Sequence, residues 1–167
     1  QKYEDTKDPR LLKYISLYNN IQMAKKISLN SAYGAIGNNW FRYFDLKIAT
    51  AITTSGQLSI RWIEKALNIY LNKILETKNE DYVIASDTDS VYITFDVLVS
   101  RVFKEGGTPE KITDILDTFA KEKLEPFILK SYTALAESMN AYEQKMHMSR
   151  EVIADKGIWT AKKRYIL

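Results

Sequence analysis

The 167 residues contain no cysteine, three prolines and one histidine. Without cysteine the chain can form neither a disulfide framework nor a thiolate metal site, which fits a reducing compartment. No apolar run approaches the ~20 residues that a membrane-spanning helix needs. The start, QKYEDTKDPR, is polar, has no initiator methionine and does not look like a signal peptide. We therefore expect a fragment of a larger protein.

What is present is charge, and it is unevenly distributed. The net charge is +3, but residues 1–80 carry twelve Lys/Arg against seven acids, and residues 81–155 carry eight against fourteen. The last twelve residues contain four basic side chains and no acid. An acidic middle between basic flanks suits a cation site between surfaces that meet phosphates. Ordinary solvated surface charge would explain the same imbalance.

Hydrophobic spacing and turn residues predict an α+β fold of one domain, or of a small domain with an appendage. Apolar residues at helical spacing predict a helix over 10–37, begun by Asp8-Pro9, and another over 46–75 with one buried stripe. We expect that stripe to contain Ile52, Leu58, Trp62, Leu67 and Leu71. A further helix begins near Glu110, and Glu125-Pro126 opens or kinks its continuation towards residue 139. Strands are expected at 82–86 and 90–95, and as a pair around Asp155-Lys156-Gly157.

The first predicted helix carries a polar set at spacings of four, three and four, namely Lys26, Asn30, Tyr33 and Gly37. These positions lie on one helix face, and Lys26 and Tyr33 are ~10 Å apart along the axis. That length matches a nucleoside triphosphate, with the ammonium at the phosphates and the amide and phenol near sugar and base. Neighbouring glycines such as Gly34 would admit a ligand. The alternative is a helix with one polar, solvated face.

Two further stretches carry possible chemistry. Asp87 and Asp89 lie between predicted buried strands, on one side of the hairpin by the period of two. Mg²⁺ often takes only one or two protein carboxylates, so this is a candidate metal site, although a solvated Asp-rich turn is the alternative. At the end, WTAKKRYIL interleaves cations and aromatics, and alternation would place Lys163 and Tyr165 on one face and Lys162 and Arg164 on the other. Such a strand could bind a nucleic-acid backbone, or be a basic edge that resists aggregation.

In combination, these three motifs resemble family B DNA polymerases. The order is Lys-x-x-x-Asn-Ser-x-Tyr-Gly (26–34), Asp-Thr-Asp-Ser (87–90) and Lys-x-Tyr (163–165). The stretches GNNWFRYFDLKIATAITTSGQ and KKRYIL are similar to polymerases of T-even-like bacteriophages, and the resemblance covers nearly the whole chain. It implies that residues 1–38 are the end of the fingers and 39–167 most of the palm. A long fingers helix would then pack on an antiparallel palm sheet with flanking helices.

The resemblance also implies roles. Lys26 would contact the triphosphate of a deoxynucleotide, and Asn30, Tyr33 and Gly34 would line the pocket for the nascent base pair. Asp89 would ligate two Mg²⁺ ions, with Asp87 as a supporting carboxylate and Glu151 as a third acid close to the metals. The primer–template duplex would be held by the basic and aromatic residues of the last motif, namely Lys162, Lys163, Arg164 and Tyr165.

The chain departs from the family pattern in places. Ala85-Ser86 stands where the family has Tyr-Gly, and the loop before IWTAKKRY is short. The first catalytic motif, Asp-x-x-Ser-Leu-Tyr-Pro, does not occur in these residues. We therefore expect the chain alone to be inactive and to need the upstream palm, exonuclease and thumb, from the same or a separate chain, in the host cytoplasm. A non-catalytic nucleic-acid-binding module is the main alternative, while another palm enzyme such as a reverse transcriptase lacks its expected motif.

Overall fold

The computed structural model describes residues 7–103 and 107–167, so the polar start of the chain lies largely outside it. The chain separates into two compact units, residues 1–54 and residues 55–167, and each is described by itself. Helices and two antiparallel two-stranded sheets make up the described part, which confirms the α+β class. Among these residues no helix is both long and apolar enough to cross a membrane.

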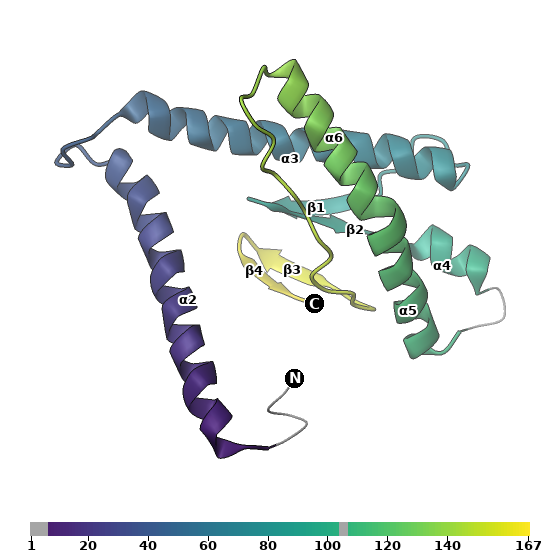
Figure 1. Cartoon of the computed structure of the whole chain (residues 1–167). Helices are drawn as coiled ribbons and strands as arrows, with labels where there is room; N and C mark the ends of the chain where they lie inside the picture. The colour runs from purple at the N-terminus through teal and green to yellow at the C-terminus, as the bar shows by residue number, and fades with distance from the viewer. Residues whose placement is uncertain (1–6, 104–106) are drawn as a thin grey trace. The chain divides into compact units, whose positions relative to one another are not determined.

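The first unit contains helix α2 (Pro9–Ile36), the loop that follows and the start of helix α3 (Leu46–Ile74) (Figure 1). The predicted start is confirmed, because the Asp8 carboxylate accepts the Arg10 amide and Pro9 opens the helix. At the other end, Asp45 caps α3 by accepting the amides of Lys47 and Ile48. The Asp45 amide in turn donates to the Ile36 carbonyl, which closes the loop onto the end of α2.

The second unit has a continuous hydrophobic core. It is formed by the C-terminal half of α3, strand β1 (Val83–Asp87), helix α6 (Glu125–Ser138) and the π-helical segment η1 (Ala120–Leu124). Ile63, Leu67 and Leu71 of α3 are fully buried, and the Tyr70 ring stacks on Phe127 of α6. Of the predicted buried stripe of α3, Leu67 and Leu71 are confirmed, whereas Ile52, Leu58 and Trp62 are exposed. The buried positions of α3 recur every fourth residue. The row that contains Leu67 therefore continues towards the N-terminus through Ile63 and Ser59.

Two β-hairpins complete the second unit. Strand β1 pairs with β2 (Ser90–Ile93), which confirms the predicted hairpin around Asp-Thr-Asp. Strands β3 (Ile158–Ala161) and β4 (Arg164–Ile166) form the other. The prediction of two strands around Asp155-Lys156-Gly157 is wrong. Residues 140–157 contain no helix or strand, and the hairpin turns at Lys162-Lys163.

Helices α4 (Asp96–Val102) and α5 (Pro109–Phe119) connect the first hairpin to the core. The sequence did not predict α4, which has two turns and is too short for a clear hydrophobic period. Helix α5 begins at Pro109 and runs into η1 and then α6, which begins at Glu125, so the predicted helix and the opening of its continuation at Glu125-Pro126 are confirmed.

Candidate active site

The acidic turn, residues 87–90, connects β1 to β2 with Thr88 and Asp89 as its two turn residues. Thr88 has a left-handed backbone, with φ of 51°, as tight hairpin turns require. The Thr88 hydroxyl donates to the Asp87 carboxylate at 3.0 Å, and the Ser90 hydroxyl donates to the Asp87 carbonyl at 3.1 Å. Asp87 ends β1 and is half-buried, whereas Asp89 is exposed in the turn. The alternation of a strand therefore does not extend to Asp89.

The basic turn, residues 161–164, is likewise a two-residue turn and belongs to the last hairpin. Ala161 pairs with Arg164, so Lys162 and Lys163 are the turn residues, and Lys163 has φ of 61°. The prediction that Lys162 and Lys163 lie on opposite faces of a strand is therefore wrong. Both lysines are exposed at the tip of the hairpin.

The acidic and basic turns meet. The ammonium of Lys163 lies 3.8 Å from a carboxylate oxygen of Asp87, and both side chains remain partly exposed. Such a pair contributes little to stability because water screens it. The pair is informative because it shows that the two turns are neighbours in the fold. Lys163 and Asp87 are 76 positions apart in the chain, yet the cation of the basic turn lies beside the carboxylate of the acidic turn.

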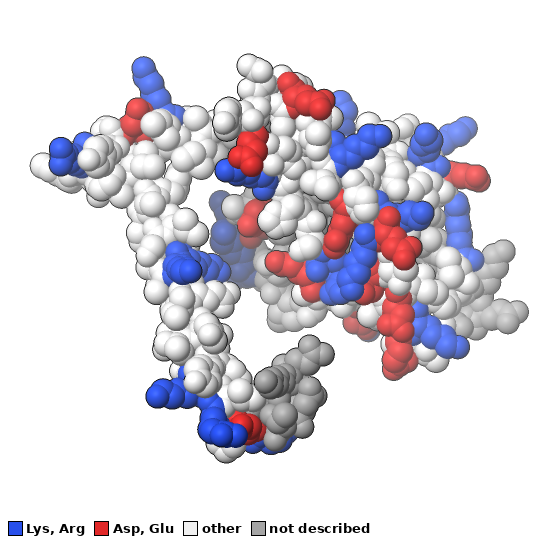
Figure 2. All heavy atoms as spheres, viewed as in Figure 1, with Lys and Arg blue, Asp and Glu red and all other residues white. Residues whose placement is uncertain are grey.

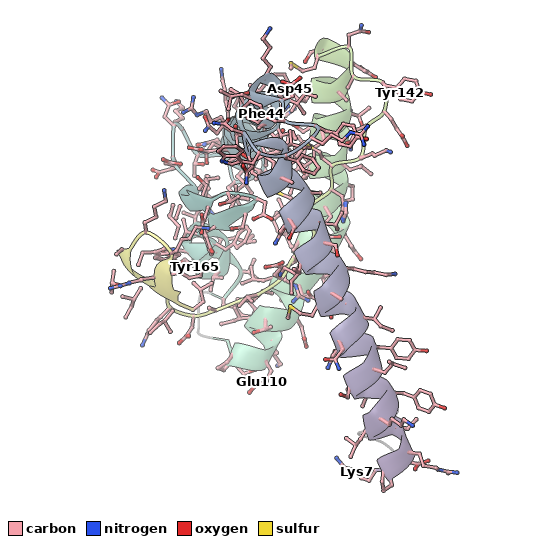
Figure 3. The ribbon with its side chains drawn as sticks, turned by 90° about the vertical axis from the view of Figure 1, so that its left-hand side faces the viewer. Lys7, Phe44, Asp45, Glu110, Tyr142 and Tyr165 are labelled. Atoms are coloured by element: carbon pink, nitrogen blue, oxygen red, sulfur yellow. The ribbon has the colours of Figure 1, made fainter. Side chains whose placement is uncertain are left out.

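An aromatic cluster of Tyr92, Trp159 and Tyr165 joins the two hairpins beside the turns. The Tyr92 ring meets Trp159 and Tyr165 edge-on, with centroid distances of 5.3 Å and 5.4 Å. Figure 3 labels Tyr165 where the last hairpin meets the first. Gly157 allows the cluster to close, because a Cβ there would lie 2.6 Å from the Trp159 ring. Sequence reasoning missed Tyr92 and Trp159, although each is an aromatic residue three positions from a predicted site residue, Asp89 and Lys162 respectively.

The electrostatics of Tyr165 connect this cluster to the acids. The pKa of its phenol is raised, first by a hydrogen bond and charge interaction with Tyr92 and then by desolvation. The negative charges of Asp87 and Glu151 raise it further, in smaller measure. Three of the predicted site residues, Asp87, Lys163 and Tyr165, are thus neighbours, and Glu151 is close enough for its charge to be felt at the same phenol.

The nucleotide-binding candidates lie in the first unit, on α2. Lys26, Asn30 and Tyr33 occupy one face of a continuous helix, and all are exposed. A Cβ on Gly34 would meet no atom within 4 Å, so packing does not require glycine there. The helix contains Arg10, Lys13, Lys25 and Lys26 but no Asp or Glu, so its net charge is positive.

The donor set of the acidic turn suits a hard divalent cation. Asp87 and Asp89 offer carboxylate oxygens, and Mg²⁺ commonly takes one or two of these with water and phosphate as its other ligands. Within residues 7–103 and 107–167 there is no group of three or more His, Asp or Glu side chains arranged to hold a metal by themselves. Asp87 and Asp89 are therefore the carboxylates of the acidic turn that could contribute ligands to a metal, together with ligands from outside these residues.

Comparison with known proteins supplies the family. The sequence pattern of "DNA polymerase family B" matches residues 4–125, which include α2 and the acidic turn. This chain belongs to DNA polymerase family B. It is 44% identical to the DNA-directed DNA polymerase of Enterobacteria phage T4 over 93% of its length, and 44% identical to that of Escherichia phage RB69 over 87%. The predicted similarity to T-even-like phage polymerases is confirmed.

A more distant relative is the DNA polymerase beta of African swine fever virus, with 30% identity over 86% of this chain. The chain spans only 18% and 17% of the length of the two phage relatives and 11% of this viral one. The similarity therefore concerns one segment of much longer polymerases.

Proposed function

We propose that this chain forms the nucleotide-binding and metal-binding segment of a DNA-directed DNA polymerase, with residues 1–38 in the fingers and 39–167 in the palm. The proposal is supported above all by the contact between Lys163 and Asp87, which joins the acidic turn to the basic turn in a family B chain. Further support comes from α2, the helix that carries the Lys26 motif, because all of its charged side chains are basic.

The residues of the chain have distinct tasks in this proposal. Lys26 pairs with oxygens of the deoxynucleoside triphosphate, while Asn30, Tyr33 and Gly34 line the pocket for the new base pair. Asp89 and Asp87, assisted by Glu151, hold the metal site. Two Mg²⁺ ions, when bound, neutralise the attacking and leaving oxygens of an in-line phosphoryl transfer. The basic turn and Tyr165 hold the primer end of the duplex, with Lys162 and Arg164 on its phosphates.

Asp89 provides the test of this function. We suggest a chimera in which residues 1–167 replace the aligned segment of the phage T4 relative. Primer extension by this chimera is measured in a buffer that resembles the host cytoplasm. Asp89→Ala should lower the extension rate at least about a hundredfold, the scale expected when preorganised charge is removed from an active site. Affinity for primer–template DNA should not change. Asp114→Ala, which removes an exposed carboxylate from α5, is the matched control and should extend normally.

The outcomes separate the two candidate functions. If Asp89→Ala extends primers as fast as the unaltered chimera, the role given to Asp89 is wrong. A non-catalytic module would instead show DNA binding that falls with salt and is indifferent to Mg²⁺ and to Lys26→Ala.

The 167 residues alone should not extend a primer. They supply one of the two metal-bridging aspartates that the family resemblance implies, because the Asp-x-x-Ser-Leu-Tyr-Pro motif is not among them. We expect the remaining palm, exonuclease and thumb regions to complete the enzyme, which would act in the cytoplasm of the infected host cell.

A further inference from the structure

The strap, residues 140–157, carries Glu151 and connects α6 to β3 without any helix or strand. Figure 1 shows it as the green-to-yellow segment that returns along the second unit from the end of α6. A segment without its own backbone ladder depends on contacts with its surroundings for a fixed position. The position of the strap, and with it that of Glu151, therefore depends on contacts with neighbouring elements.

Arg150 makes three polar contacts at this point. Its backbone amide donates to a carboxylate oxygen of Glu125 at 3.0 Å, and its guanidinium donates to the Glu151 carbonyl at 3.2 Å. The same guanidinium forms an ion pair with Asp117 through the carboxylate oxygen that is enclosed by the protein. One residue thus ties the peptide of Glu151 to α5 and α6.

The partners of Arg150 form a ridge across the junction of the helices. Asp117, Lys121 and Glu125 follow each other at spacings of four, from the end of α5 through the π-helical segment to the start of α6. Lys121 donates to the other oxygen of Asp117 at 2.6 Å. The pKa of Asp117 is lowered, first by Lys121 and then, against the opposing effect of desolvation, by Arg150. The carboxylate is therefore ionised and fixed between two cations. Figure 2 shows positive and negative side chains interspersed over this face of α5 and α6.

Other contacts of the strap do not act at Glu151. Lys145 pairs with Glu143, and Gln144 bonds to Met146, so these interactions stay within the strap. Met146 contacts the Ser59 hydroxyl through sulfur, and Met148 packs against the core. Arg150 is the charged contact directly before Glu151, whose charge in turn reaches the Tyr165 phenol together with that of Asp87.

We infer that Arg150 is a positioning residue: with Asp117 and Glu125 it forms a clasp that holds the strap on α5 and α6 and keeps Glu151 near the acidic turn. The clasp acts on the reaction through Glu151 and does not itself touch a substrate. This inference rests on the proposed function for its catalytic consequence, but the clasp can be tested without it.

The first test measures amide hydrogen exchange in the 167-residue chain by mass spectrometry. Arg150→Met removes the guanidinium and should speed exchange over residues 148–157 about tenfold, because local opening becomes easier. Lys145→Met removes an equal charge from the same strap and should leave this exchange unchanged. Equal exchange in the two variants overturns the inference. If circular dichroism shows that Arg150→Met does not fold, Asp117→Asn, which keeps the volume of the side chain, serves as the second variant.

The second test uses the chimera with the phage T4 relative and separates kcat from KM. Arg150→Met should lower kcat about tenfold, as expected for loss of a residue that orients a metal ligand, and should raise the Mg²⁺ concentration needed for half-maximal rate. The KM for nucleotide and the affinity for DNA should stay within about twofold, since ligand-binding residues are intact. Lys145→Met should behave as the unaltered chimera.

The two tests separate the existence of the clasp from the proposed polymerase function. If Arg150→Met frees the strap but leaves kcat and the Mg²⁺ requirement unchanged, positioning of Glu151 is wrong while the polymerase proposal stands. If the Asp89→Ala chimera extends primers normally, the proposed function fails, and the exchange experiment still decides whether the clasp exists.

Discussion

Helix α2 and the C-terminal half of α3 are both long helical segments, but they are stabilised in different ways. Helix α2 has 28 residues and none is buried, although it contains large apolar side chains such as Ile15, Leu17 and Tyr18. Figure 2 shows it as a mostly uncharged surface with a few basic side chains. In α3, by contrast, Ile63, Leu67 and Leu71 are completely buried. One segment is stabilised by its cap and backbone, and the other by a core.

The two groups of candidate residues, on α2 and at the acidic turn, therefore have different structural support. Isolated helices are marginal in water, because tertiary packing supplies most helical stability in proteins. The acidic turn, in contrast, follows a strand whose start is anchored to α3. We therefore expect damage in the second unit to unfold the protein, whereas substitutions on α2 should change ligand binding with little effect on folding.

The largest contrast is expected from one chemical change made in both regions. Leu67→Ala empties a fully buried position and should lower the free energy of unfolding by about 2–5 kcal/mol, through lost burial and the cavity left behind. Leu17→Ala, whose side chain is 49% exposed on α2, should change it by less than about 0.5 kcal/mol. Urea unfolding followed by circular dichroism gives both values. Similar losses in the two variants would remove the distinction between the regions.

A smaller effect is expected from the anchor of β1. Asn68 of α3 accepts the amides of Tyr82 and Val83 and donates to Asp81, so its side chain joins the strand to the helix. Asn68→Ala leaves these partly buried amides without that acceptor and should cost about 1–3 kcal/mol. Asn20→Ala on the exposed surface of α2 is the control and should be neutral or slightly stabilising, since alanine favours helix. An equal response of the two variants in urea unfolding would show that Asn68 is no anchor.

The smallest effect concerns the cap of α2 and depends on pH. The pKa of Asp8 is lowered, first by its side-chain hydrogen bonds with Arg10. Because this pKa is lowered in the folded state, the ionised Asp8 carboxylate stabilises α2 fully at pH values above the usual pKa of an aspartate, which is near 4. This stabilisation of the helix is lost as the pH falls through the folded-state pKa. Asp8→Asn still caps but cannot titrate. Helicity of the unaltered chain should therefore fall slightly more than that of Asp8→Asn between pH 5 and pH 2. Parallel curves would contradict this.

Local sequence signals predicted the longer helices and the first hairpin, though not the short helix α4, because their causes are local. Asp8-Pro9 fixes the start of α2, and the apolar run on each side of Asp-Thr-Asp fixes a hairpin with a two-residue turn. The last hairpin was misplaced because Asp155-Lys156-Gly157 has turn-like residues, whereas the chain turns at two lysines, one of them in a left-handed conformation. Gly157 instead makes room for the Trp159 ring.

The features of the candidate site that could not be predicted from the sequence depend on long-range contacts. The aromatic contacts of Tyr92 and the clasp of Arg150 join residues that are far apart in the chain, and no periodicity connects them. The candidate residues themselves were predicted from motif and spacing, and their roles stay predictions. The contact between Lys163 and Asp87 adds a geometry that neither motif contains by itself.

The central claim is that Lys26 binds the triphosphate of the nucleotide, and affinity labelling of the chimera tests it most directly. A deoxynucleoside triphosphate with a reactive acyl group on its terminal phosphate acylates a lysine that lies at that phosphate. With primer–template DNA and Mg²⁺ present, mass spectrometry should find the adduct on Lys26 and not on the adjacent Lys25, and leaving out Mg²⁺ should abolish it. Equal labelling of both lysines, or labelling of Lys26 that ignores Mg²⁺, would contradict the account.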